Sequence, residues 1–185
     1  MSGNRRTSHP LRQASATDLP AVLHLHRQAF PAGEGERITQ VVEELWRGST
    51  AGTHPVHHWV ITTTQQAIVG HVSLSSITTE AERMVGWILA PLAVASGHQG
   101  QGLGSALVQQ AIGHAMDSDQ PRILVYGDPA YYRRFGFDHQ PAVAFKPPYP
   151  LSQPMGWQCL VANGKALHDS VDIRCHPALM HVDLW

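Results

Sequence analysis

A glycine-rich stretch from Gln99 to Val108 reads QGQGLGSALV, with glycine at positions 100, 102 and 104. Glycine costs backbone entropy on folding, so three glycines at alternate positions indicate that the bare backbone has a use. A strand-like apolar run (86–95) precedes the stretch and a helical pattern follows it, which places several unpaired amides at a helix N-terminus. Because such amides and the helix dipole attract phosphate groups, we expect a phosphate-bearing ligand here.

Three phosphate-binding patterns compete for this stretch. A Walker loop ends in Gly-Lys-Ser/Thr, and the stretch contains no lysine. A dinucleotide fingerprint has the spacing G-x-G-x-x-G and an acidic residue about 20 residues later. Here the spacing is G-x-G-x-G, and Asp117 and Asp119 come before the next strand. The third pattern fits, because Gln99-x-x-Gly102-x-Gly104 resembles the Q/R-x-x-G-x-G/A signature of the GCN5-related N-acetyltransferase (GNAT) superfamily. A tight turn whose glycines serve packing alone is the structural alternative.

The residues before the loop also resemble this superfamily, and in particular its YhbS-like branch, in which a Pro-Leu-Ala-Val strand leads into the loop. Proline inside a strand belongs at a bulge or an edge, and the resemblance implies a bulge that splays this strand from its neighbour. It further implies that acetyl-CoA pairs with the opened strand and that a strand amide polarises the thioester carbonyl. The implied cofactor-binding residues are Leu92, Ala93, Val94, Gln99, Gly100, Gln101, Gly102, Leu103, Gly104 and Ser105.

A second signature lies at residues 132–137, YRRFGF, which resembles the Tyr-x-x-x-Gly-Phe that ends a helix in many members. The resemblance implies that the hydroxyl of Tyr132 is the general acid that protonates the CoA thiolate. We expect the neighbouring Tyr131 to be a packing residue, since it points elsewhere on a helix.

One position departs from the superfamily pattern. Asp128, followed by Pro129, stands where many members have an asparagine, and this pair reads as the N-cap and first position of a short helix. An acidic residue does not favour contact with anionic CoA. Arg133 and Arg134 can offset its charge or reach the 3′-phosphate.

An amine acceptor is mostly protonated at neutral pH, so a base or a water chain must remove its proton. The candidates are the acidic residues around the second predicted helix and one strand histidine: Glu34, Glu36, Glu43, Glu44 and His71. We select Glu36 as the catalytic base because it lies at the predicted loop-to-helix junction.

The 13 histidines and two cysteines raise the questions of a metal site and of a reactive thiol. His24 and His26 would diverge on a helix, and neither cysteine belongs to a CxxC pair, so we predict no metal site. Cys159 lies in an apolar strand, where a buried thiol is usually inert. Two isolated cysteines fit reduced thiols and a cytoplasmic protein.

The elements that must position these residues follow an order β-α-α-β-β-β-α-β-α-β-β. Apolar periodicity and turn signals predict strands near 11–14, 59–63, 67–78, 86–95, 122–126, 142–145 and 157–162, and helices near 17–29, 37–49, 102–116 and 128–135. This order predicts an α/β fold around one mixed sheet. The resemblance implies the acyl-CoA N-acyltransferase fold, a twisted mixed sheet with a splayed, bulged strand and flanking helices. We expect one N-acetyltransferase domain over 1–185, with a core of about 10–162 and an extension (163–185) packing on the sheet.

Composition excludes several classes of function. The 185 residues carry 13 Lys+Arg and 14 Asp+Glu, a formal charge of −1, so a broad nucleic-acid-binding surface is not expected. The longest apolar stretch (88–95) is too short to cross a bilayer, and no apolar segment follows the arginines near the N-terminus.

The prediction is therefore an acetyl-CoA-dependent N-acetyltransferase that moves an acetyl group to a primary amine by direct attack through a tetrahedral intermediate. A non-catalytic acyl-CoA-binding module is the alternative, and a nucleotide-dependent oxidoreductase is disfavoured by the glycine spacing. The partners are a small-molecule or peptide amine, with no nucleic acid and no membrane. A homodimer is compatible with the superfamily, although nothing in the sequence requires one.

Overall fold

The computed structural model describes residues 9–48, 54–162, 165, 167 and 169–185. The strands are β1 (Leu11–Gln13), β2 (Val56–Thr62), β3 (Ile68–Thr78), β4 (Met84–Val94), β5 (Arg122–Tyr126), β6 (Phe145–Lys146), β7 (Trp157–Val161) and β8 (Val171–Asp172). The α-helices are α1 (Leu19–Ala29), α2 (Glu34–Gly48), α3 (Leu103–Met116), α4 (Pro129–Tyr132) and α5 (His139–Ala142). Short 3₁₀ turns are η1 (Ala16–Asp18), η2 (Ser96–His98), η3 (Arg133–Phe135), η4 (Pro154–Gly156), η5 (Pro177–Leu179) and η6 (Val182–Leu184).

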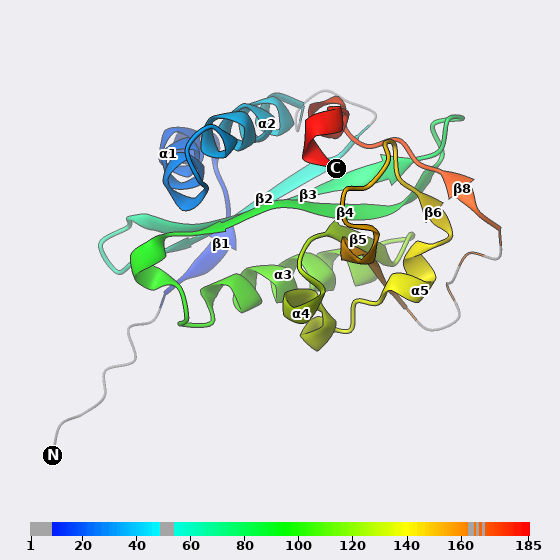
Figure 1. Ribbon diagram of the computed structural model, residues 1–185. Coiled ribbons are helices and arrows are strands. Elements are labelled where there is room, and N and C mark those ends of the chain that lie inside the picture. The colour runs from blue at the N-terminus through cyan, green and yellow to red at the C-terminus, as the bar shows by residue number, and fades with distance from the viewer. Residues whose placement is uncertain (1–8, 49–53, 163–164, 166, 168) are drawn as a thin grey trace, which may run out of the picture.

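A six-stranded sheet in the order β1-β2-β3-β4-β5-β7 forms the centre of the fold. Its neighbours are antiparallel except β4 and β5, which are parallel and are joined through α3. Helices α1 and α2 cover one face of the sheet and α3 covers the other (Figure 1). The predicted mixed sheet with flanking helices is confirmed.

Strand β4 carries the predicted bulge. Val72 of β3 faces Leu92 and Leu74 faces Leu89, so β4 has one more residue than β3 between these two pairs. The extra residue falls at the cis Ala90–Pro91 bond. On its other side β4 pairs with β5 only at Trp87 and Ile88, and the two strands then part. The described part of the chain supplies no strand partner for that edge beyond Ile88, so the edge is open.

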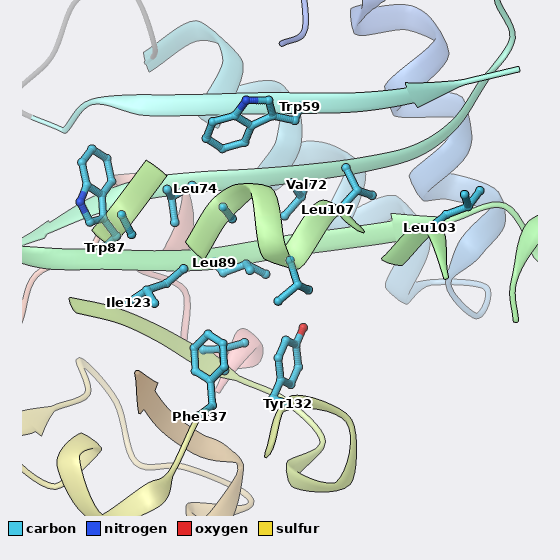
Figure 2. Packing of buried hydrophobic residues seen from close by; sticks show 14 of the residues in the cluster. Trp59, Val72, Leu74, Trp87, Leu89, Leu103, Leu107, Ile123, Tyr132 and Phe137 are labelled. Atoms are coloured by element: carbon cyan, nitrogen blue, oxygen red, sulfur yellow. The ribbon is translucent and has the colours of Figure 1, made fainter. Parts of the chain in front are cut away.

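The core between α3 and the sheet includes two of the predicted functional residues, Leu103 and Tyr132. Leu103 and Leu107 of α3 pack with apolar side chains of β2 to β5 (Figure 2). Tyr132 joins this cluster at its margin, with its ring centroid 5.7 Å from that of Phe137. The short helix that carries Tyr132 is therefore anchored to the sheet by apolar contacts.

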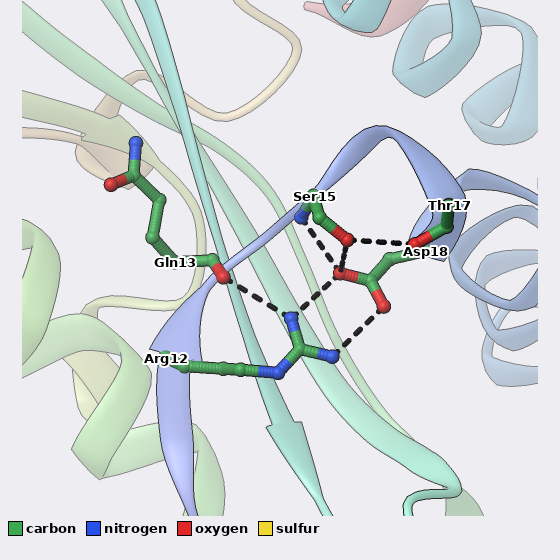
Figure 3. Close-up of polar contacts among 5 residues, drawn as sticks. All are labelled: Arg12, Gln13, Ser15, Thr17 and Asp18. Atoms are coloured by element: carbon green, nitrogen blue, oxygen red, sulfur yellow. Dashed lines mark hydrogen bonds and ion pairs between the residues drawn. The ribbon is translucent and has the colours of Figure 1, made fainter.

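On the other face of the sheet, a polar cluster joins β1 to the start of α1 (Figure 3). Two guanidinium nitrogens of Arg12 donate to the two carboxylate oxygens of Asp18, at 2.7 and 2.9 Å. The backbone amide of Ser15 donates to the same carboxylate at 2.7 Å. These bonds, led by the one from Arg12, hold the pKa of Asp18 well below its usual range. Asp18 thus fixes the direction in which α1 leaves the sheet edge.

Two predicted elements differ from the structure. The second helix begins at Glu34, three residues before the predicted start, because Gly35 lies inside it and does not break it. A Cβ at Gly35 would lie 2.7 Å from the carbonyl oxygen of Arg27, so this glycine permits α1 and α2 to touch. The predicted strand over 142–145 is also wrong, since Ala142 ends α5 and only Phe145 enters a strand.

The expectation of one sheet is wrong for the same region. Strand β6 pairs with β8 in a separate two-stranded parallel sheet, and only β7 adds to the main sheet. The side chain of Asp138 accepts from the amide of Gln140 and caps α5, which turns the chain away from the main sheet before β6. Within the described residues, none of the helices has the length and apolar character needed to cross a membrane.

Candidate active site

The glycine loop has the backbone geometry of an anion-binding turn. Gly100 and Gly102 have φ angles of 73° and 81°, in the left-handed region that favours glycine. Gly102 is the N-cap of α3, so the amides that follow it begin the helix and have no partner within it. The side-chain amide of Gln99 donates to the carbonyl of Val94 at 3.1 Å and ties the loop to the end of β4.

A cavity of about 490 Å³ lies over this loop, and we call it the loop cavity. It is lined by Leu92, Val94, His98, Gln99, Gly100, Gly102, Leu103, Gly104, Ser105, Tyr131 and Arg134. Arg134 is the arginine among these described lining residues, and its guanidinium carbon lies 4.0 Å from the centre of the Tyr131 ring. Helix amides and a guanidinium facing one cavity suit a phosphate or pyrophosphate.

Eight of the ten residues expected to bind the cofactor line the loop cavity, and Ala93 and Gln101 do not. The side chain of Ala93 is buried, and the residue is paired with His71 of β3. Gln101 is exposed, and its side-chain amide donates to the carbonyl of Gly97 at 3.4 Å. Ala93 was expected to act through its backbone, and that role stays a prediction.

A second cavity, of about 530 Å³, opens where β4 and β5 part, and we call it the acceptor cavity. It shares Leu92 and Tyr131 with the loop cavity, so the two meet along the open edge of β4. Its lining comes from separate parts of the chain: Phe30, Glu34, Ile38, Val41, Ile88, Leu89, Ala90, Pro91, Leu92, Tyr126, Gly127, Asp128, Tyr131, Tyr132, Leu179, Leu184 and Trp185.

Tyr132 lines the acceptor cavity and is only 9% exposed. Burial, assisted by the neighbouring Tyr131, raises its pKa well above the usual range of a phenol. The hydroxyl is therefore protonated at neutral pH and is available as a proton donor. A Cβ at Gly127 would lie 2.6 Å from the Tyr132 ring, so glycine there leaves room for this side chain.

The sequence predicts a packing role for Tyr131, and the structure adds a second role. It contacts the apolar cluster and also lines both cavities. A Cβ at Gly104 would lie 2.7 Å from the Tyr131 hydroxyl, which therefore sits directly against the first turn of α3. The neighbouring Asp128 is the predicted N-cap, since its carboxylate accepts from the amide of Ala130 at 2.9 Å.

The acidic residues of α2 are separated by the helix. Glu34 lines the acceptor cavity, whereas Glu36 is exposed and lines neither of the two cavities. Two residues along an α-helix lie on nearly opposite faces, which explains the separation. Glu36 as the base stays a prediction, but Glu34 is the α2 carboxylate that lines the cavity. Glu34 is among the candidate bases named from the sequence, and extending the helical pattern back to it would have favoured it over Glu36.

The other candidate base, His71, lies away from both cavities. It is fully buried, its Nδ1 is 2.8 Å from Nε2 of His26, and its Nε2 is 3.2 Å from Nδ1 of His58. Burial lowers the pKa of all three histidines, to about 3 for His26 and about 4 for His58. This histidine chain joins α1 to β2 and β3 and has a structural role.

Both cysteines are buried free thiols, and burial raises the pKa of each to about 12. A protonated, buried thiol is a poor nucleophile, so Cys159 does not enter the chemistry. Within the described residues, no group of three or more histidine, cysteine or acidic side chains is arranged to hold a metal ion.

Sequence reasoning missed the lining residues that come from distant segments. Phe30 follows α1, and Leu179, Leu184 and Trp185 belong to the last described segment, which Figure 1 places beside α2. No local pattern marks these side chains, because only the packing of their segments over the sheet brings them to the cavity. Arg134 was named from the sequence, since it lies inside the tyrosine motif, two positions after Tyr132.

The fold and the paired cavities agree with a comparison against known families. The sequence profile described as "Acetyltransferase (GNAT) family" matches residues 19–137, which is more than half of the chain. The chain belongs to the acetyltransferase (GNAT) family and is an acyltransferase. The resemblance on which the sequence analysis rested is confirmed.

Among its relatives is a protein named as an uncharacterized N-acetyltransferase, YhbS, of Escherichia coli (strain K12). It is 33% identical over 124 residues, which cover 65% of this chain and 68% of YhbS. The crystal structure of Escherichia coli YhbS in complex with CoA has a TM-score of 0.84, at 21% identity, and covers 98% of this chain and 97% of that one. A Brucella melitensis GNAT family acetyltransferase in complex with acetyl-CoA has a TM-score of 0.72, at 20% identity, covering 94% and 99%. These structures share the fold of this chain.

Proposed function

We propose that the protein transfers the acetyl group of acetyl-CoA to a primary amine. The observation that carries the proposal is the meeting of the two cavities at the open edge of β4, with the glycine loop at one and the Tyr132 hydroxyl at the other. A phosphate site and a proton donor joined by an unpaired strand edge are the parts that this transfer needs.

The residues present fit acetyl-CoA. The pyrophosphate would lie on the amides between Gly100 and Ser105, with Arg134 beside it. The pantetheine amides would pair with the open edge of β4 past Leu92, as an added strand does. The CoA and acetyl-CoA bound to the two structurally similar acetyltransferases support this placement.

The reaction forms a C–N bond and breaks a C–S bond through a tetrahedral intermediate. Tyr132 gives its proton to the departing thiolate, and the attacking amine loses a proton to a carboxylate or to water. Glu36 is the base predicted from the sequence, and Glu34 is the carboxylate nearer the chemistry. Holding both reactants in line lowers the barrier by about 7–11 kcal/mol, and a positioned acid adds roughly 10²–10⁴-fold.

A thermal-shift titration tests the cofactor half of the proposal. Acetyl-CoA at a hundred times its Kd adds about 2.7 kcal/mol of stability, which is roughly 5–11 °C for a chain of this size. We expect this shift with acetyl-CoA and desulfo-CoA and none with NAD. Thiol release in the presence of amines then tests turnover. An unchanged melting temperature at millimolar acetyl-CoA would contradict the proposal.

A further inference from the structure

The chemistry of the acceptor cavity restricts which amines fit it. Its walls are mostly apolar: Phe30 and Ile38 line it from the end of α1 and from α2, and Leu179 and Leu184 line it from the last described segment. Trp185 adds an aromatic surface, because its ring stacks on that of Tyr126 with centroids 6.1 Å apart and planes 17° apart. An acceptor with an apolar, aromatic skeleton would leave these side chains well covered.

The charges at the cavity have one sign. Glu34 and Asp128 are the charged side chains among the described lining residues, which include no arginine, lysine or histidine. Asp128 already caps α4, whereas Glu34 is exposed and forms no ion pair with another described residue. A carboxylate or phosphate on the acceptor would therefore be buried beside like charge with no cation to pair it.

The nearest arginine of α2 does not change this charge pattern. The guanidinium of Arg37 donates to the carbonyl of Asp183 at 3.3 Å and lies 3.7 Å from its carboxylate. Arg37 lines a smaller depression beside the acceptor cavity, not the cavity itself. Its contact with Asp183 instead ties the last described segment to α2.

The aromatic wall is held in place from two sides. The indole nitrogen of Trp185 donates to the carbonyl of Leu179 at 3.0 Å, and its ring meets that of Trp157 edge-on at 5.6 Å. The hydroxyl of Tyr149 donates to the carbonyl of Met180 at 2.9 Å. Trp185 is therefore a fixed surface against which an acceptor can pack.

We infer that the acceptor is a primary amine with an aromatic, apolar skeleton that carries no carboxylate or phosphate, an aralkylamine such as tryptamine or 2-phenylethylamine. Trp185 and its neighbours take the ring, and Glu34 attracts the ammonium group before it loses its proton. This inference rests on the proposed function, because it concerns the second substrate of the same reaction.

Matched substrate pairs test it with the unmodified protein. Tryptamine is compared with tryptophan, and 2-phenylethylamine with phenylalanine, by thiol release at saturating acetyl-CoA. We expect kcat/KM about 100-fold higher for each amine than for its amino acid, because only the amino acid buries an unpaired carboxylate. A lysine-containing peptide and glucosamine 6-phosphate extend the panel to the other classes of acceptor.

Two variants and a control test which side chains determine the KM for the amine. Trp185→Ala should raise KM for tryptamine about 10-fold and leave KM for acetyl-CoA unchanged. Glu34→Gln should raise KM for tryptamine about 3-fold at low salt and less at high salt, since Glu34 is exposed. Glu82→Gln, an exposed carboxylate in the β3–β4 turn that lines neither cavity, is the matched control and should change neither.

The outcomes separate this inference from the proposed function. Turnover of the amino acids, the peptide or the sugar phosphate at rates equal to the aralkylamines would overturn the inference while the acetyltransferase proposal stands. If no amine is turned over, calorimetry of tryptamine with the acetyl-CoA-loaded protein decides, and an absence of binding would overturn the inference. Failure of acetyl-CoA itself to bind is the separate result that would refute the proposed function.

Discussion

The two cavities that meet at β4 are built in different ways. The loop cavity takes nearly all of its lining from one continuous stretch, Leu92 to Ser105, and Tyr131 and Arg134 complete it. The acceptor cavity is assembled from side chains between Phe30 and Trp185 that lie on both helical layers and on the last described segment. One strand end and the turn after it form most of the first cavity, whereas the second depends on how distant segments pack.

This difference separates the kinds of change each cavity tolerates. The loop cavity binds through backbone amides, which a side-chain substitution does not remove. It is therefore sensitive to substitutions that change the conformation of the turn or fill the space above it. Side chains of the acceptor cavity can be exchanged one at a time with graded effects on the shape and charge of the site. We therefore expect the largest losses from the loop and smaller, substrate-dependent changes from the acceptor side.

Gly102→Glu should give the largest effect. Gly102 combines a φ of 81° with a place at the first turn of α3, so glutamate strains the turn and sets a negative charge where the pyrophosphate would lie. We expect the Kd for acetyl-CoA to rise at least about 100-fold by calorimetry. Gly97→Glu is the matched control, since open space surrounds Gly97, its φ is not positive and it lies outside both cavities. Equal affinity in the two variants would show that the loop does not bind the cofactor.

Tyr132→Phe tests the junction of the two cavities. Removal of the hydroxyl should lower kcat about 100-fold or more and leave the Kd for acetyl-CoA unchanged, because the lost group only donates a proton. Stopped-flow or steady-state thiol release measures the first quantity and calorimetry the second. Tyr131→Phe is the informative comparison, since its hydroxyl faces Gly104 and should affect cofactor affinity more than kcat. A kcat for Tyr132→Phe within a factor of two of the wild type would remove Tyr132 from the mechanism.

The same difference decides how much the sequence could predict. The glycine spacing, the proline at the bulge and the tyrosine motif are local, so the loop, the splayed β4 and the short helix of Tyr132 were predicted from these motifs and from the superfamily that they resemble. Trp185 was not, because its role follows from the packing of a weakly patterned segment. Glu34 was named among the candidate bases but was not selected, because the predicted start of α2 lies three residues too late. A single domain over 1–185 and a cytoplasmic location stay predictions.

The buried histidine chain makes the layer beside the acceptor cavity sensitive to acid. Helices α1 and α2 flank that cavity, and the chain of His26, His71 and His58 joins α1 to the sheet. On the other face His114 of α3 packs against His57, and burial lowers the pKa of both, so that layer contributes to the acid response as well. Burial lowers the pKa of these histidines in the folded protein, while in the unfolded chain they take up protons near pH 6.5. The unfolded state therefore binds more protons below that pH. The free energy of unfolding is highest well above pH 6.5 and falls as the pH drops through 6.5 toward about 4, by up to about 1.4 kcal/mol per pH unit for each histidine.

Urea unfolding between pH 8 and pH 5 measures the slope of the free energy of unfolding against pH. His26→Gln should reduce the slope by the contribution of one proton, even though the variant is less stable at neutral pH. His24→Gln is the matched control on the same helix, because His24 is exposed, and it should keep the slope of the wild type. A slope that is the same in all three proteins would exclude the histidine chain as its source.

Arg134→Ala should give the smallest effect on cofactor binding and sharpens the description of the loop cavity. Arg134 lines that cavity and lies over the Tyr131 ring, whereas the adjacent Arg133 is exposed and lines neither cavity. We expect the Kd for acetyl-CoA to rise about 10-fold in Arg134→Ala, as one charge-assisted contact to a phosphate is lost, and to stay unchanged in Arg133→Ala. The difference between the two variants should shrink with added salt, since the contact is open to solvent. Removing the 3′-phosphate from the ligand tells which phosphate Arg134 contacts. If 3′-dephospho-CoA binds Arg134→Ala and Arg133→Ala with equal Kd, the guanidinium contacts the 3′-phosphate. If the 10-fold difference in Kd persists, it contacts the pyrophosphate held by the glycine loop.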